Sequence, residues 1–290
     1  MSTAELTHDP SDLGRPIQGP TAFGSDPSRI WRLTWTMAVT DFKLRFFGSV
    51  LGYLWQLMRP LLLFGVIYIV FAEVLKVGGD QPFFGVALLL GIVMFQFFTD
   101  ATSGSVRSIV LREGVVRKVD FPRLAVPASV VLMALFNLAL NFIPVTIFLF
   151  AAGGRVSVRW LELPLIILML LVFVCGLAML LSSLFVKYRD VEPIWDVIIQ
   201  ALFYGTPILY SISVVIEKAG IEVARLMLVN PVATAIQQAR HAMIDPSYEG
   251  VGQIFGTSAG FLVPIAVSLI TFVAGLIVFN RAAPHIAEQL

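Results

Sequence analysis

SVLGYLWQLMRPLLLFGVIYIVF, residues 49–71, is the first long apolar run of the chain, and it decides the fold class. A run of about 20 apolar residues is long enough to cross the hydrocarbon core of a bilayer as a helix. This run carries an arginine, Arg59, and a helix breaker, Pro60, near its start, and both are costly inside a membrane. Their presence at that position indicates a functional role at one mouth of a path through the membrane.

The composition extends this conclusion to the whole chain. Of the 290 residues 58% are hydrophobic and only 13% are charged, whereas soluble domains carry about 25% charged residues. The net charge of +1 argues against a nucleic-acid partner, which requires a concentrated basic face. The single cysteine, Cys175, excludes an intrachain disulfide and a cysteine-cluster metal site. We therefore expect an all-α membrane protein.

The apolar runs predict six transmembrane helices. The expected spans are 50–76, 82–101, 124–151, 163–186, 192–212 and 257–280. The fifth is the least apolar, and we expect it to be kinked because it contains Asp196, Gln200, Gly205 and Pro207. Most of the 20 Lys and Arg residues lie in the N-terminal part, in the loops after the second and fourth spans and at the C-terminus. The positive-inside rule therefore predicts a multi-pass protein of the plasma (inner) membrane with both termini cytoplasmic.

Other segments complete the predicted organisation. Residues 1–28 are polar, rich in Pro and Gly, and lack a signal-peptide core, which predicts a disordered cytoplasmic tail. Residues 29–46 place Trp and Phe on one helical face and basic residues on the other, as in an interfacial amphipathic helix; a helix of a small soluble domain is the alternative. Residues 47–290 form the transmembrane domain. Within it, the apolar stretch 213–256, broken at Asn230-Pro231, predicts re-entrant helices between the fifth and sixth spans.

Motifs for covalent chemistry are absent from the sequence. It contains no GxxxxGK[ST] nucleotide-binding loop, no HExxH and no GxSxG. Its three histidines, His8, His241 and His285, are widely separated, so no metal site is predicted. We expect a chain that is not an enzyme and binds no cofactor itself.

The loop 103–123 predicts a docking element. Helical spacing in its first part sets apolar residues against basic ones, and a break at Gly114 precedes a second part in which apolar and basic residues alternate. The positive-inside rule accounts for the basic residues but not for the apolar ones. The apolar residues that we expect to be exposed are Ile109, Val110, Val115 and Val116. A short amphipathic helix of this kind, projecting into the cytoplasm, is typical of a partner-binding surface.

Aromatic residues near the span ends are candidates for a path that carries sugars, because the C–H faces of sugars pack on aromatic rings while their hydroxyls stay hydrated. The candidates are Tyr53, Trp55, Trp195, Tyr204 and Tyr210. Aromatic residues at such positions also serve as interfacial anchors. Tyr204 and Tyr210 are the better candidates because they flank the Gly-Thr-Pro break at 205–207.

Five blocks occur in a distinctive order along the chain. They are SxLGxxWxxxxP at 49–60, KVDFP at 118–122 followed by Pro127, RDV at 189–191, TPILYS at 206–211, and Asn230-Pro231 followed by Arg240. In this order the chain resembles permease subunits of ABC-2 type exporters, most closely the branch that exports lipid-linked polysaccharides such as O-antigen and teichoic acid. The resemblance extends from residue 29 to the end. Arg59 departs from it, since many members have asparagine there.

The resemblance implies a homodimer of six-span permeases that binds two separate ATPase subunits, with ATP and Mg held by the ATPase. It further implies that helix 29–46 contacts both the ATPase and the membrane, that 105–119 is a coupling helix, and that 213–245 closes the exit. The implied coupling residues are Arg107, Ile109, Val110, Arg112, Arg117, Lys187, Arg189 and Asp190.

The predicted function is the permease subunit of an ATP-driven exporter of lipid-linked polysaccharide, of the O-antigen, teichoic-acid or cell-wall galactan type. Arg59, with Arg45 or Lys43, is a candidate for receiving the pyrophosphate of a polyprenyl-linked substrate, and snorkelling of Arg59 to the headgroups is the alternative. An ATP-independent secondary transporter or lipid flippase is the alternative function. That class favours acidic or histidine relays near the bilayer midplane and an internal repeat, neither of which the sequence shows.

Overall fold

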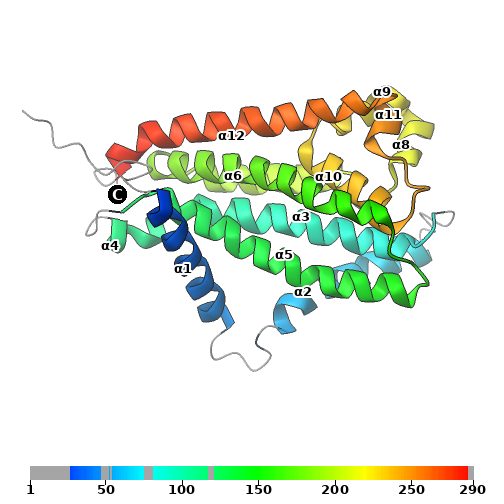
Figure 1. Cartoon of the computed structure of the whole chain (residues 1–290), viewed down its shortest axis with the longest axis horizontal. Coiled ribbons are helices and arrows are strands. Elements are labelled where there is room, and N and C mark those ends of the chain that lie inside the picture. The colour runs from blue at the N-terminus through cyan, green and yellow to red at the C-terminus, as the bar shows by residue number, and fades with distance from the viewer. Residues whose placement is uncertain (1–26, 47–51, 53, 75–80, 117–120, 287–290) are drawn as a thin grey trace, which may run out of the picture.

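The long helices of this protein form a bundle. The structure, a computed structural model, describes residues 27–46, 52, 54–74, 81–116 and 121–286, and these residues form helices and loops with no strand. Four long helices lie side by side along the longest axis, as Figure 1 shows. They are α3 (Phe84–Val106), α5 (Ala125–Ala151), α6 (Leu163–Lys187) and α12 (Leu262–Ala282). The predicted all-α membrane fold is confirmed in these residues.

Among the described residues, five helical segments are long and apolar enough to cross a membrane. They are Leu54–Phe71, Phe84–Val106, Ala125–Ala151, Val158–Lys187 and Ala259–His285. The first combines α2 (Leu54–Tyr68) with the start of a π-helical segment, η2 (Ile69–Val74), and the fourth includes the 3₁₀ turn η4 (Val158–Glu162). The expected fifth span holds only α7 (Val191–Gly205), whose 15 residues reach about 22 Å. This is short of the ~30 Å hydrocarbon core, so a sixth crossing stays a prediction.

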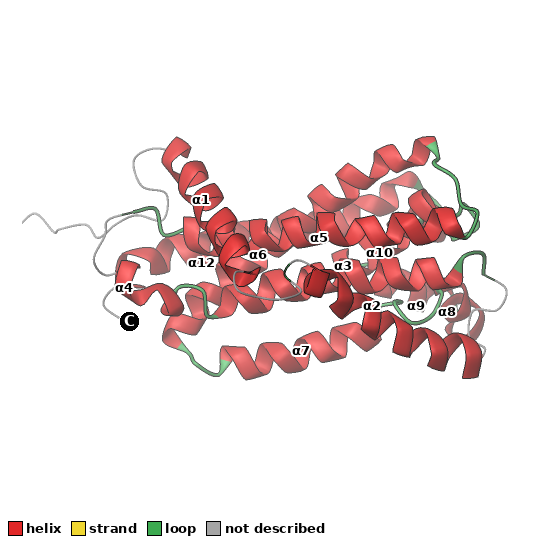
Figure 2. Ribbon diagram, turned by 90° about the horizontal axis from the view of Figure 1, so that it is seen from below, coloured by secondary structure: helices red, strands yellow, loops and turns green. Residues whose placement is uncertain are grey.

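α3 is the centre of the bundle. Its apolar residues run all round the helix, and such a helix has no face suited to water. Accordingly 72% of its spanning window is buried inside the chain, against 11% for α2 and 17% for α12. Leu88, Leu89 and Leu90 are completely buried in succession. α3 therefore supports the other helices, while α2 and α12 are little covered by the chain; α12 runs along the upper edge in Figure 1 and α7 along the lower edge in Figure 2.

α6 and α12 approach each other backbone to backbone. A Cβ atom on Gly275 would overlap the carbonyl oxygen of Gly176, and a Cβ atom on Gly176 would lie 2.6 Å from the Cα of Phe272. Glycine is the residue that permits such an approach, and small residues at helix interfaces are typical of membrane bundles. This contact fixes α12 against the rest of the bundle.

The helix of the expected fifth span ends at Gly205 instead of continuing through a kink to residue 212. Thr206 is extended, and Pro207 lacks the N–H that a continuing helix requires. Short helices follow at the end of the bundle that carries α8, α9 and α11 in Figure 1. They are α8 (Ile212–Ala219), α9 (Ile221–Met227), α10 (Pro231–Ala239) with its π-helical end η5 (Arg240–Ile244), and α11 (Val251–Phe255).

The expected break at Asn230-Pro231 is where α10 begins. Pro231 occupies its first turn, and the Asn230 side chain accepts a hydrogen bond of 3.0 Å from the Val232 N–H. The stretch before this break forms two helices. It is split into α8 and α9 at Gly220, whose φ of 89° lies in the left-handed region that glycine tolerates.

α1 (Pro27–Phe46) crosses α5 steeply at the opposite end of the bundle (Figure 1). Thr34 and Ala38 are buried, and Trp35 and Phe42 pack edge-on against Phe136 of α5 at 5.5 Å and 5.9 Å. We call this end the basic end; it comprises α1, the loop turns η3 (Val110–Arg112) and α4 (Glu113–Val116), the first turn of α7, and η7 (Ala283–His285). The predicted tail, apart from its last two residues, lies outside the described residues.

Candidate functional site

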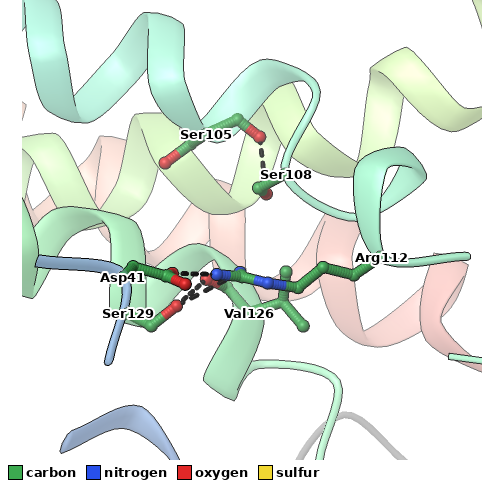
Figure 3. Close-up of polar contacts among 6 residues, drawn as sticks. All are labelled: Asp41, Ser105, Ser108, Arg112, Val126 and Ser129. Atoms are coloured by element: carbon green, nitrogen blue, oxygen red, sulfur yellow. Dashed lines mark hydrogen bonds and ion pairs between the residues drawn. The ribbon is translucent and has the colours of Figure 1, made fainter. Parts of the chain in front are cut away.

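The side chain of Arg112 ties three elements of the basic end together (Figure 3). Its guanidinium forms an ion pair with Asp41 of α1 and donates a hydrogen bond of 3.3 Å to the Ser129 hydroxyl of α5. Ser129 in turn donates to the Val126 carbonyl at 2.7 Å. Because Asp41 and Arg112 lie 71 residues apart in sequence, this contact fixes the position of α1 relative to η3.

A second ion pair joins α3 to α7. Arg107, directly after α3, contacts the carboxylate of Glu192 in the first turn of α7 at 2.5 Å. Both side chains are partly exposed, so the pair contributes at most about 1 kcal/mol to stability. The ion pair positions the start of α7 beside the loop that carries Arg112.

The loop between α3 and α5 turns its apolar residues in two directions. Ile109 and Val116 are 1% and 3% exposed and pack with Phe279 of α12 in a small hydrophobic cluster. Leu111 is 77% exposed. The expectation that Ile109 and Val116 are exposed is therefore wrong, since both side chains anchor the loop to the bundle, and Leu111 is the apolar residue presented outward.

An open cleft of about 420 Å³ lies between α1, α3, η3 and α5. It is lined by Asp41, Leu44, Arg45, Gly104, Ser108, Leu111, Arg112, Val130 and Met133. Ser108 is held by a hydrogen bond of 2.8 Å to the Ser105 carbonyl, as Figure 3 shows. The cleft thus has a polar wall at Asp41 and Arg112 and an apolar wall formed by α5 and Leu111.

Two arginines from different elements act on one acidic residue near the basic end. Asp100 of α3 accepts a hydrogen bond of 2.6 Å from Gln96. The positive charges of Arg45, at the end of α1, and Arg59, in α2, both act on the Asp100 carboxyl group. The Arg59 side chain is exposed on the surface of α2. Arg45 and Arg59 therefore both contribute positive charge near Asp100 of α3.

Comparison with known proteins places the chain in a family. The profile of the ABC-2 type transporter family matches residues 32–244, which is most of the chain. This chain belongs to the ABC-2 type transporter family. The resemblance drawn from the five sequence blocks is thereby confirmed.

Relatives of this ABC-2 type transporter include polysaccharide-export proteins. It is 30% identical over 253 residues to the O-antigen export system permease protein RfbA of Klebsiella pneumoniae, covering 86% of this chain and 92% of the relative. It is 29% identical over 180 residues to a protein of the same description from Myxococcus xanthus, covering 62% and 68% of the two chains. The polysialic acid transport protein KpsM of Escherichia coli is 21% identical over 246 residues, covering 83% and 89%.

The coupling residues predicted for this ABC-2 type transporter fall into three groups. Arg107, Lys187, Arg189 and Asp190 are exposed at the basic end. Arg112 and Ile109 are engaged within the chain, and Val110 is half-buried. Arg117 lies outside the described residues. The exposed group comes from two loops, because Arg107 follows α3 whereas the other three lie between the end of α6 and the start of α7.

The residues predicted for the transport path are also divided. Tyr204 and Trp55 are exposed, and Tyr210 is half-buried and donates its hydroxyl to the Tyr204 carbonyl at 3.1 Å. Trp195 is only 8% exposed; it donates to Thr102 at 3.2 Å and packs on Phe98, so it holds α7 against α3. Tyr53 lies outside the described residues.

Sequence reasoning missed Asp41 as a partner of Arg112, although one signal was present. Asp41 is the one acidic residue of α1, a helix that also holds Arg29, Arg32, Lys43 and Arg45. Glu192 was expected near the end of a span, but its partner Arg107 lies 85 residues away in sequence. No metal-binding cluster of His, Cys, Asp and Glu occurs in the part of the chain that the structure describes.

Proposed function

We propose that this chain is the permease subunit of an ATP-driven exporter that moves a polysaccharide, attached to a polyprenyl lipid, outward from the cytoplasm across the plasma membrane. The observation that carries the proposal is the 30% identity to an O-antigen export permease over 92% of that relative. The more distant polysialic acid transporter extends the likeness to a second polysaccharide. O-antigen, teichoic acid and cell-wall galactan are the candidate glycans.

The basic end is proposed to bind a separate ATPase subunit that holds ATP and Mg. The chain itself has no nucleotide-binding loop, so the energy of ATP hydrolysis must reach it through a contact. Leu111 supplies an exposed apolar anchor, and Arg107, Lys187 and Arg189 supply exposed cations. Arg112 then acts through Asp41, so that a push on η3 moves α1 as well.

Replacing Leu111 with aspartate is expected to release the ATPase subunit while the permease stays folded, because the exposed side chain contributes to binding and little to the core. Co-purification from membranes and the thermal unfolding of the permease are the measurements. Leu226→Asp is the matched control, since Leu226 is 72% exposed on α9 at the other end of the bundle. Full retention of the ATPase by Leu111→Asp would refute this docking surface.

The same experiment separates the two function classes. An ATP-independent secondary transporter or flippase would purify with no ATPase subunit in the wild-type form and would take up substrate on an ion gradient alone. ATP-dependent export that requires a co-purifying ATPase would exclude that class.

The entrance is proposed to lie where Arg45 and Arg59 act on Asp100. Guanidinium groups suit phosphate because they present several donors in a planar fork. Two guanidinium groups on neighbouring elements could together receive a diphosphate group. Trp55, exposed on α2 one helical turn before Arg59, would contact the first sugar.

Replacing Arg59 with glutamine should lower export by about ten-fold or more, since one hydrogen bond to a charged group is worth roughly 1.5–3 kcal/mol. Assembly with the ATPase should be unchanged, because Arg59 is an exposed residue of α2 that lies outside the basic end. Surface glycan, measured by gel electrophoresis and immunoblotting, gives the readout. Arg155→Gln, at an exposed arginine between α5 and η4, is the control. Normal export by Arg59→Gln would leave snorkelling as the role of this residue.

The proposal includes a homodimer with both termini cytoplasmic, six crossings per protomer, and α8 to α10 as re-entrant helices. It is supported by the uncovered surfaces of α2 and α7. Only 11% of the α2 spanning window is buried, and Trp195 is the one buried residue of α7. Apposition of these helices in two protomers would cover both and would enclose the exposed polar face of α7, formed by Asp196, Gln200 and Tyr204.

A further inference from the structure

The segment between α7 and α8, residues 206–211, leaves several backbone carbonyl groups without a helical partner. Thr206 is extended after the last turn of α7, and α8 begins only at Ile212. Thr206, Ile208 and Leu209 are nevertheless buried. Buried backbone polar groups require partners, and non-helical backbone at membrane depth is tolerated only where protein or water supplies them.

Arg240 supplies these partners. Its guanidinium donates from Nη1 to the carbonyls of Pro207 and Tyr210 at 2.6 Å and 3.5 Å, and from Nη2 to the Ile208 carbonyl at 2.7 Å. Its Nε donates to the Ala87 carbonyl of α3 at 3.2 Å. A single side chain of η5 therefore holds the 206–211 segment against the central helix of the bundle.

The fold makes room for this guanidinium. Arg240 is 2% exposed, and a Cβ atom on Gly91 of α3 would lie 3.1 Å from its Nη2 atom. No carboxylate bonds Arg240 among the residues that the structure describes. A buried cation is strongly unfavourable unless its surroundings compensate it, and here backbone carbonyls provide the compensation. The environment of the charge therefore depends on the conformation of residues 206–211.

The held segment also positions the two tyrosines of the path. The Tyr210 carbonyl is bonded by Arg240, and the Tyr210 hydroxyl bonds the Tyr204 carbonyl at the end of α7. We propose that Arg240 is a positioning residue that holds residues 206–211 against α3 and thereby fixes Tyr204 and Tyr210, the two tyrosines proposed for the transport path. This rests on the proposed export function, which supplies the path.

The test measures the position of the segment directly. In a Cys175→Ala background, which removes the single cysteine, Leu209→Cys reports on the segment because Leu209 is 6% exposed. Its reaction with a membrane-impermeant maleimide is measured on the full-length permease in cell membranes. Arg240→Lys keeps the charge but loses the planar fork, and the reaction rate should rise about ten-fold, the factor expected for one lost charge-assisted hydrogen bond.

Two controls and one alternative variant make the result specific. Arg225→Lys should leave the rate unchanged, because Arg225 also bonds a carbonyl, that of Ile254 at 3.0 Å, but does not touch residues 206–211. A second reporter, Val145→Cys in the buried part of α5, should stay unreactive in Arg240→Lys, as general unfolding would expose it too. If Arg240→Lys fails to fold, Gly91→Ala keeps the arginine while pressing on Nη2 and should raise the Leu209→Cys rate.

An unchanged reaction rate of Leu209→Cys in folded Arg240→Lys or Gly91→Ala would overturn the proposal. An equal rise in the reaction rates of Leu209→Cys and Val145→Cys would also overturn it, because the whole bundle would then have loosened. Export of surface glycan is recorded in the same cells. Absence of glycan export by the wild type would refute the proposed function, whereas the maleimide rates would still decide whether Arg240 holds the segment.

Discussion

Replacing Gly275 with valine is expected to separate α6 from α12 and to prevent the bundle from forming. Even a methyl group at this position would overlap the Gly176 carbonyl oxygen, and the neighbouring atoms are backbone that cannot rotate away. Overpacking of a tight core usually costs about 1–3 kcal/mol and sometimes more. We expect the upper end or beyond here, because the obstacle is the main chain of the partner helix.

Size-exclusion profiles in detergent and thermal unfolding would measure this loss. Gly65→Val is the matched control, since Gly65 also lies inside a spanning helix, but a Cβ atom added there would meet no other atom within 4 Å. The control should unfold at the wild-type temperature. A Gly275→Val protein that also unfolds at that temperature would contradict the close contact.

Replacing Ile109 with aspartate is expected to destabilise the basic end by several kcal/mol. The side chain is 1% exposed among Val116, Met179 and Phe279, and removing a buried apolar group costs about 2–5 kcal/mol before the charge is considered. The aspartate would also place a carboxylate among the apolar side chains of that cluster. Loss of ATPase binding in this variant would therefore follow from unfolding of the loop rather than from a lost contact.

Hydrogen exchange of the loop and of the α12 end distinguishes these causes. The loop and the α12 end should exchange faster than wild type in Ile109→Asp and at the wild-type rate in Leu111→Asp. Binding of the ATPase is expected to be lost in each of the two variants. Equal protection of the loop in the two variants would show that Ile109 does not anchor it.

The spans were predictable because composition alone determines them. Long apolar runs identify α2, α3, α5, α6 and α12, and the Asn-Pro pair identifies the start of α10 because proline and an Asn cap act within a few residues. The end of α7 at Gly205 was only partly predictable. Gly205 and Pro207 indicate a disturbance, but whether a helix kinks or stops depends on the partners that its freed carbonyls find, and Arg240 is 33 residues away from Pro207.

The orientation of the loop after α3 was not predictable from its pattern. Ile109, Val110 and Leu111 are consecutive apolar residues, and helical spacing cannot say which of them faces the bundle and which faces outward. That choice is made by Phe279 and Ala283, far along the chain. The same limit applies to Arg112. The sequence suggested that it binds the ATPase subunit, whereas in the fold it forms an ion pair with Asp41.

The glycine contact between α6 and α12 has a mechanical consequence. One wall of the bundle is joined main chain to main chain, whereas α7 is held to α3 through side chains such as Trp195 and Phe203. A displacement of α7 requires only side chains to rearrange, whereas a displacement of α12 requires two main chains to separate. A force applied to the bundle should therefore move α7 more readily than α12.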